Sequence, residues 1–308
     1  MEAFFIVFQN VAIMMAYLVA GLLIVKIGKA RTEHAMSVST LLIYVCGPCM
    51  VINSFLGMEF SAENNIAVAK FFVVSFIIQI LFLAIVYVFV RNKLTDSKFR
   101  ILSVASVLGN VGFLGLPLVA ALFPTEPVVA AYSSIYVMSM NIIVFSVGVY
   151  MITGDKKYMS LKAILANPTT IAILIAMPFY IFDINLPEAA TSGIVLMAKM
   201  TTPLCMVVLG MRLAAVNPKV LFSRPFAYIT CVLKLFVFPL FAYMCVKFIP
   251  WFDDTFKVCM LVLSATPTAA IVLSLSEIHE QQQELSANVV LLSTIFSLIS
   301  IPLMLLIV

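Results

Sequence analysis

An apolar run of the sequence is interrupted by glycine, asparagine and proline, in the string Gly109-Asn110-Val111-Gly112-Phe113-Leu114-Gly115-Leu116-Pro117. Each glycine costs about 1 kcal/mol in a helix interior and a proline costs about 3 kcal/mol, so the string predicts a broken helix. A second apolar run has its counterpart at Ser264-Ala265-Thr266-Pro267-Thr268-Ala269-Ala270. Two breaks of this kind favour a binding site between two discontinuous helices.

The chemistry of such a site follows from the backbone. Broken backbone at bilayer depth is tolerated where it is buried in protein or lines a wet cavity. The helix that restarts after a break presents free N–H groups and a positive dipole end, which suit an anion. We therefore expect an anion site formed by residues of both breaks, with close helix packing and a simple kink as the alternative. The residues are Gly109, Asn110, Gly112, Thr266, Pro267 and Thr268.

Two lysines lie inside apolar runs. Lys234 is about ten residues from either end of its run, or ~15 Å at 1.5 Å per residue, which is too deep for easy snorkelling. With no carboxylate in the apolar runs to neutralise it, its partner is expected to be an anionic substrate. The alternative is an amine that is neutral or bonded to helix carbonyls. Lys199 is a weaker candidate of the same kind, and Asn141 follows the first break closely enough to face the same cavity.

Acidic side chains are missing from the middle of every apolar run, and both histidines, His34 and His279, lie in polar connections. Metal catalysis and paired-carboxylate hydrolysis therefore lack their ligands within the membrane, and we expect no enzyme activity, metal or cofactor. Ion coupling would have to use hydroxyls, amides, carbonyls or a lysine. The string Cys46-Gly47-Pro48-Cys49 resembles a dithiol motif, but its apolar flanks favour a Gly-Pro kink in a membrane helix.

The composition and the lengths of the apolar runs indicate that these residues lie in membrane-spanning helices. Of 308 residues, 64% are hydrophobic and 10% are charged, against roughly 45–50% and 25% in soluble domains. Most of the exterior must therefore face lipid. The net charge of +4 is dispersed over short loops and does not indicate nucleic-acid binding. Apolar runs of ~20 residues predict an all-α membrane protein with ten transmembrane helices, at about 4–25, 36–58, 66–90, 101–123, 127–152, 164–182, 189–211, 225–249, 256–276 and 285–307.

Basic residues predict the orientation. Thirteen of the 18 lie in or beside odd-numbered loops: Lys26, Lys29, Arg31, Arg91, Lys93, Lys98, Arg100, Lys156, Lys157, Lys162, Arg212, Lys219 and Arg224. By the positive-inside rule these loops are cytoplasmic and both termini are outside. The ninth loop, Glu277 to Glu284, has no lysine or arginine and gives the rule no support. No basic stretch precedes the first run, so we expect a retained helix and not a signal peptide.

Similar strings recur half a chain apart, around Pro48 and around Pro203, and the two breaks are in the fourth and ninth helices. Five helices per half is an odd number, so the second half is expected to be inverted relative to the first. The division is 1–152 for the first repeat, 153–163 for a cytoplasmic linker and 164–308 for the second repeat.

The string Gly109 to Leu118, with Lys234-Leu235 ahead of Pro239-Leu240 and with Thr266-Pro267-Thr268-Ala269-Ala270, resembles the auxin efflux carrier family of bacterial permeases, relatives of plant PIN proteins. The resemblance covers the full length. It departs from the plant members at Gly109, where they have a proline directly before the asparagine.

The resemblance implies a scaffold of helices 1, 2, 6 and 7, a transport domain of helices 3–5 and 8–10, crossing broken helices 4 and 9, an elevator motion and a homodimer through the scaffold. It also implies organic-anion substrates such as malate, malonate or auxin, at a site lined by Asn110, Asn141 and the second break. We expect a secondary carrier in the cytoplasmic membrane. The alternatives are a non-transporting ligand sensor, a sodium-coupled symporter of the bile-acid type and an anion channel.

Overall fold

The computed structural model describes residues 2–184, 186–216, 221–222 and 224–308. Within these ranges the chain is helical, has no β-strand, and contains eight helical stretches long and apolar enough to cross a membrane. The predicted all-α membrane protein is confirmed at this level. The described helices before residue 160 are α1 (Glu2–Lys26), α2 (His34–Leu41), α3 (Gly47–Leu56), α4 (Ala62–Val90), α5 (Ser97–Ala105), α6 (Leu116–Leu122), α7 (Val128–Ile143) and α8 (Val149–Thr153).

After residue 160 the described helices are α9 (Leu161–Leu165), α10 (Pro168–Ile181), α11 (Glu188–Ala215), α13 (Pro225–Val232), α14 (Phe238–Lys247), α15 (Asp254–Ser264), α16 (Ala270–Ile278) and α17 (Gln283–Met304). Several pairs form one continuous span through a π-helical turn: η1 (Leu42–Cys46) joins α2 to α3, η4 (Val144–Gly148) joins α7 to α8, and η6 (Leu233–Val237) joins α13 to α14.

Proline accounts for three π-helical turns. Pro48, Pro117 and Pro239 each lie in the first turn of an α-helix, directly after η1, η3 (Val111–Gly115) and η6. A proline has no N–H and its ring crowds the carbonyl four residues earlier. A wider turn before it accommodates the mismatch without ending the span. The Cys46-Gly47-Pro48-Cys49 string is therefore part of a bent helix, and both of its cysteines are free thiols.

Two segments do not cross as continuous helices. One consists of α5, an extended stretch, and η3 with α6; the other consists of α15, an extended stretch, and α16. The extended stretches contain Leu108–Asn110 and Thr266–Ala269, which overlap the two strings that predicted a broken helix, Gly109–Pro117 and Ser264–Ala270. The rest of the first string, from Val111 onward, is helical.

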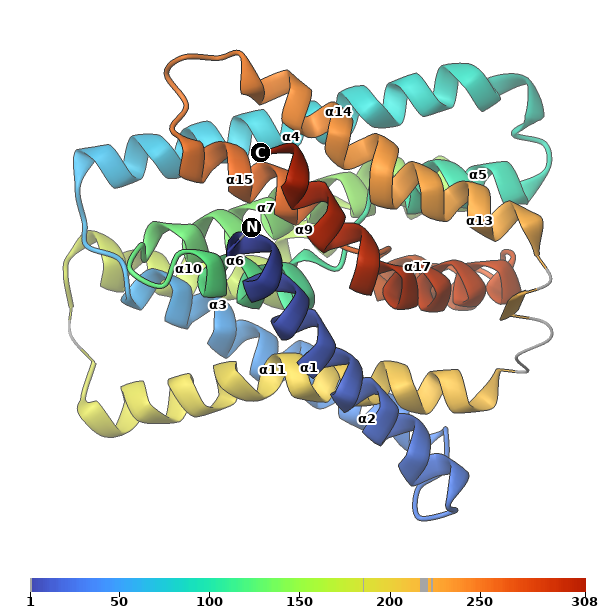
Figure 1. Ribbon diagram of the computed structural model, residues 1–308, viewed down its shortest axis with the longest axis horizontal. Coiled ribbons are helices and arrows are strands. Elements are labelled where there is room, and N and C mark those ends of the chain that lie inside the picture. The colour runs from blue at the N-terminus through green and yellow to red at the C-terminus, as the bar shows by residue number, and fades with distance from the viewer. Residues whose placement is uncertain (1, 185, 217–220, 223) are drawn as a thin grey trace.

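The long helices pack in two groups around these segments. In one group α1 packs along α11, and α3 packs against α10 and α11; in the other, α4 packs on α7 and α14 on α15. Figure 1 shows α11 along one edge of the molecule, α4 and α14 near the opposite edge, and α6 and α7 between them. The contact between α1 and α11 needs glycine at two positions, because a Cβ on Gly21 or Gly210 would overlap the facing backbone of Val207 or Leu18.

Residues next to four odd-numbered loops contact one another. Gln282 donates a hydrogen bond to Ser97 at 2.9 Å, and the rings of Tyr158 and His279 lie 4.4 Å apart. Arg224 binds Glu284 through two hydrogen bonds, at 2.9 and 3.0 Å. These loops therefore lie on one face of the molecule, as the alternating topology predicts.

The ninth loop has no lysine or arginine, and two of its acids pair with arginines that precede it in the chain. Arg224 pairs with Glu284, and Arg212 pairs with Glu277 at 3.5 Å. Lys219, which contributed to the predicted orientation, lies outside the described residues.

Candidate functional site

The two breaks are hydrogen-bonded to each other. The backbone N–H of Asn110 donates to the Pro267 carbonyl at 2.7 Å, and that of Ala269 donates to the Leu108 carbonyl at 3.0 Å. Gly109 and Thr268 thus face each other as an antiparallel bridge. Buried backbone polar groups need partners, and here each break satisfies the other.

Gly109 permits this close approach. A Cβ at this position would overlap the Thr266 hydroxyl and lie 3.0 Å from the Lys234 ammonium. A Cβ on Gly115 would lie 2.9 Å from the end of the Leu263 side chain. A Cβ on Gly112, in contrast, would make ordinary contacts at 3.5 Å. A side chain at the first or third glycine of the string would therefore displace its neighbours, most severely at Gly109, while the second glycine has space beside it.

Each helix that ends at a break has a terminal carbonyl bonded to a distant side chain. The Thr268 hydroxyl donates to the Ala105 carbonyl of α5 at 3.0 Å, and the Lys234 ammonium donates to the Ser264 carbonyl of α15 at 2.7 Å. The carboxyl end of a helix carries a partial negative charge, so a cation at the end of α15 is electrostatically favourable.

Lys234 is fully buried, and its Nζ lies 4.6 Å from the centre of the Phe238 ring. Among the described residues no carboxylate lies within ion-pair distance of it. The bond to a helix carbonyl is the alternative considered from the sequence. Lys234 does not line the cavity described below but lies directly behind Gly109, which does.

The helices that restart after the breaks begin at a cavity of about 180 Å³. Its wall includes the first residues of η3 (Val111 to Phe113) and of α16 (Ala270 and Ile271). The first turn of a helix has backbone N–H groups without intrahelical partners, so two positive helix ends contribute to one cavity. The wall contains no acidic side chain among the described residues.

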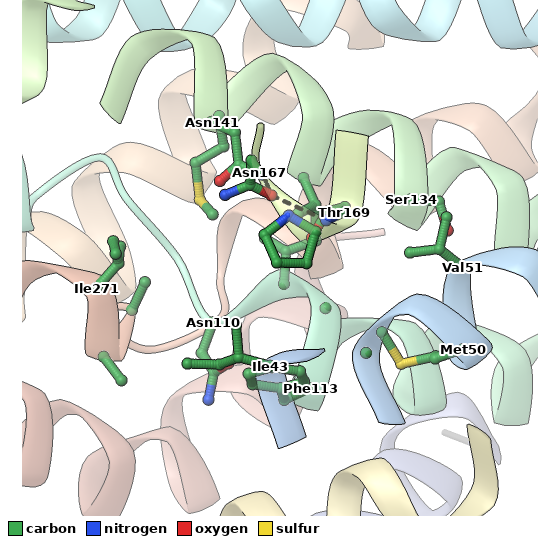
Figure 2. A pocket seen from close by; sticks show the side chains of 18 of the residues that line it. Ile43, Met50, Val51, Asn110, Phe113, Ser134, Asn141, Asn167, Thr169 and Ile271 are labelled. Carbon is green, nitrogen blue, oxygen red and sulfur yellow. Dashed lines mark hydrogen bonds between the residues drawn. The ribbon is translucent and has the colours of Figure 1, made fainter. Parts of the chain in front are cut away.

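The polar side chains of the wall are amides and hydroxyls. Figure 2 shows Asn110 on one side of the cavity, with Asn141, Asn167 and Thr169 grouped on another. Asn110 precedes η3 but does not cap it, and its side-chain amide makes, among the described residues, a single long contact of 3.9 Å to the Cys205 sulfur. The Asn141 amide donates to Asn167 at 3.3 Å. Amide donors beside helix N-termini are suited to a carboxylate.

The rest of the wall is largely apolar, with Ile43, Met50, Val51, Phe113, Leu116, Val137 and Met140. Apolar walls with a few placed polar groups are typical of small-molecule sites. The apolar residues of this wall come from both groups of helices, because Ile43 and Met50 lie in the η1 and α3 segment and Val137 lies on α7.

The structure divides the predicted site residues into two sets. Gly109, Asn110, Gly112 and Asn141 line the cavity. Thr266, Pro267, Thr268 and Lys234 are not in its wall. Pro267 and Thr268 bond to the first break. The Thr266 hydroxyl donates to the Leu263 carbonyl of its own segment at 2.7 Å, and Lys234 donates to the Ser264 carbonyl. Lys199 is exposed on the surface of α11, away from the cavity.

Four polar residues of the wall are absent from the sequence prediction: Ser134, Asn167, Thr169 and Ser274. Asn167-Pro168 has a recognisable signal, since asparagine at the N-cap followed by proline marks a helix start. Ser134 has none, because serines are common in membrane helices. Its hydroxyl is buried and has no hydrogen-bond partner among the described residues.

Comparison with known proteins indicates a membrane transport protein. Residues 5–305 match the model of a family described as membrane transport protein. An uncharacterized transporter of Methanocaldococcus jannaschii is 27% identical over 283 residues, 90% of each chain. An uncharacterized transporter of Methanothermobacter thermautotrophicus is 26% identical over 300 residues, 96% of each chain.

The family match spans nearly the whole described chain and includes both breaks, all eight predicted site residues and the cavity between them. The resemblance seen in the sequence motifs is confirmed. The chain belongs to the membrane transport protein family, the family of the auxin efflux carriers.

Proposed function

We propose that the protein is a secondary carrier of small organic anions and that the carboxylate binds at the cavity between the two breaks. One observation carries the proposal: two helix N-termini and the Asn110 amide lie at a cavity whose described wall has no acidic residue. An anion supplies the negative charge that these positive ends lack. Malate, malonate and auxin-like acids, named by the family resemblance, are the first candidates.

Lys234 contributes indirectly in this proposal. Its ammonium binds the carboxyl end of α15 behind Gly109, so its charge acts on the anion through the wall. Asn110 and Asn141 are the proposed side-chain ligands. Thr266, Pro267 and Thr268 shape the second break.

The transport cycle is proposed to be an elevator motion. The scaffold would comprise α1, α2 with α3, α10 and α11; the transport domain would comprise α4 to α8 and α13 to α17. The chain would consist of two inverted five-helix repeats, residues 1–152 and 164–308, and each repeat would contribute helices to both the scaffold and the transport domain. The cavity wall draws residues from both proposed bodies, so sliding one past the other would change access to the anion. A homodimer through the scaffold, a cytoplasmic-membrane location and external termini complete the proposal.

The test begins with binding. A ligand that binds the folded state raises its apparent stability, so the purified protein is heated with a panel of mono- and dicarboxylates. An anion that raises the melting temperature of the wild type but not of Asn110→Ala supports the site. The absence of any stabilising carboxylate contradicts it.

Flux in proteoliposomes then separates the alternatives. Binding without flux indicates a ligand sensor, and currents too large for a carrier cycle indicate a channel. Loss of flux on replacing Na⁺ with K⁺ indicates a sodium symporter. A saturable carboxylate flux that is independent of Na⁺ is the expected result.

A further inference from the structure

Asn167 caps the first turn of α10 within the cavity wall. Its side-chain oxygen accepts the backbone N–H of Thr169 at 2.9 Å, and its carbonyl accepts the N–H of Ile171 at 3.0 Å. Pro168 takes the next position, where a missing N–H has no cost. The Asn167 side chain is thus held by the backbone of its own helix.

This cap determines which way round the Asn167 amide lies. A backbone N–H needs an acceptor, so the Asn167 atom facing Thr169 must be the oxygen. The same oxygen is 3.3 Å from the Asn141 side chain. Two oxygens would repel each other there, so the Asn141 atom that faces it must be the nitrogen. Figure 2 shows both contacts as dashed lines at the cavity.

We propose that Asn167 is a positioning residue that holds the Asn141 amide with its nitrogen available to the substrate carboxylate. An amide nitrogen has two hydrogens; Asn167 takes one, and the other remains for the anion. Rotating the Asn141 amide by 180° would replace this donor with an oxygen that repels a carboxylate. The assignment rests on the proposed function, since it concerns the same cavity.

Asn167 acts through Asn141 in this assignment and is not itself a ligand. Its oxygen already accepts two N–H groups, and a direct contact from its own nitrogen to the anion would weaken binding on removal of Asn167 whether or not Asn141 is present. The effect of losing Asn167 should therefore depend on whether Asn141 is present. This dependence separates positioning from direct contact and from a general loss of structure.

The experiment is a double-mutant cycle on the affinity of the full-length protein for malonate, measured by calorimetry. The proteins are the wild type, Asn141→Ala, Asn167→Ala and the double variant. We expect Asn167→Ala to weaken binding about 5- to 10-fold when Asn141 is present and less than about 2-fold when it is absent. Any effect of losing the α10 helix cap should be the same with and without Asn141, so it cancels in the difference between the two fold-changes.

A second variant separates the cap from the contact with Asn141. Serine is also a good N-cap, so Asn167→Ser keeps an acceptor for the Thr169 N–H but is too short to reach Asn141. It should weaken binding as much as Asn167→Ala. The matched control is Ser160→Ala, which removes the cap of nearby α9 and should leave the affinity for malonate unchanged.

Three results overturn the assignment alone: equal weakening in both backgrounds, no weakening by Asn167→Ala, or wild-type affinity in Asn167→Ser. If the wild type binds neither malonate nor malate nor indole-3-acetate, the proposed function fails and the assignment fails with it. The wild-type titration therefore distinguishes the two failures.

Discussion

The two breaks at the centre of the molecule use different residues for different tasks. The first has glycines, an uncapped π-helical turn and the Asn110 amide beside the cavity. In the second, the hydroxyls of Thr266 and Thr268 are both bonded to backbone carbonyls, and both side chains are buried. Only its last residues, from Ala269 onward, reach the cavity wall.

This difference indicates a division of roles. In the proposed site, the first break supplies a polar side chain for recognition, and the second supplies backbone and hydroxyl contacts to the first. Both supply a helix N-terminus. A pair of breaks that looks equivalent in sequence is therefore expected to respond differently to substitution, in affinity at the first and in stability at the second.

The largest effect is expected where the two breaks touch. Gly109→Ala places a methyl group against Thr266 and the Lys234 ammonium, and overpacking of this kind costs typically about 1–3 kcal/mol. Thermal unfolding in detergent should show a clear loss of stability. Gly112→Ala, whose Cβ meets only ordinary contacts at 3.5 Å, is the matched control. Equal melting temperatures for the two variants would contradict the close contact between the two breaks at Gly109.

Replacing Lys234, which lies behind the contact between the two breaks, should affect both the stability of the protein and its affinity for the carboxylate. Lys234→Met leaves the Ser264 carbonyl buried without its partner, which costs about 1–3 kcal/mol. In the proposed site it also removes a positive charge from behind the anion. We expect a lower melting temperature without ligand and, in addition, a weaker affinity for the carboxylate.

Lys234→Gln is the companion variant, since it retains a donor but not the charge. Unchanged carboxylate uptake by Lys234→Gln would leave the lysine a purely structural role. Unchanged stability of Lys234→Met would instead show that the bond to the end of α15 contributes nothing.

At the first break, Asn110→Ala should weaken carboxylate binding about 10-fold, an effect of about 1.4 kcal/mol, with little loss of stability. The reason is that the Asn110 side chain makes only a long contact to Cys205 and does not cap η3. At the second break, Thr268→Val removes the hydroxyl bond to the Ala105 carbonyl. This variant should lose stability and keep nearly the same affinity for the carboxylate. Calorimetry and thermal unfolding on both variants test the division of roles, which fails if the two behave alike.

The sequence predicts the breaks well because their causes are local. Glycine and proline disfavour helix wherever they occur, so the strings around Asn110 and Pro267 identify both extended stretches without knowledge of the fold. Hydropathy likewise locates the spans, because ~20 apolar residues suit a bilayer whatever their neighbours. The inverted relation of the two halves stays a prediction.

The partners of these residues could not be predicted, since they come from distant parts of the chain. Nothing in a sequence pattern pairs Lys234 with a backbone carbonyl of Ser264, because every residue has a carbonyl. The role of Asn167 is unpredictable from the sequence for a related reason: an N-cap asparagine normally serves only its own helix, and its contact with Asn141 depends on how α7 packs against α10.

A smaller effect is expected from Pro267→Ala. The bond between the breaks uses the carbonyl of residue 267, and alanine retains it. The proline contributes mainly by restricting the unfolded chain, which is worth about 0.4–1 kcal/mol. We expect affinity within about threefold of wild type and a slightly lower melting temperature. A large loss of transport at normal expression would show that the proline ring itself matters.

The smallest effect concerns the ion pair between Arg212 of α11 and Glu277 of α16. Its atoms are 3.5 Å apart and both side chains are partly exposed, so it should contribute about 0–1 kcal/mol and less at high salt. Arg212→Gln should therefore leave carboxylate affinity unchanged, because neither residue lines the central cavity.

The pair nevertheless joins α11 of the proposed scaffold to α16 of the proposed transport domain. The ion pair of Arg224 with Glu284, in contrast, lies within the proposed transport domain. If the two bodies slide, Arg212→Gln should alter the transport rate and Arg224→Gln should not. Identical rates for both variants would show that this contact does not open during the cycle.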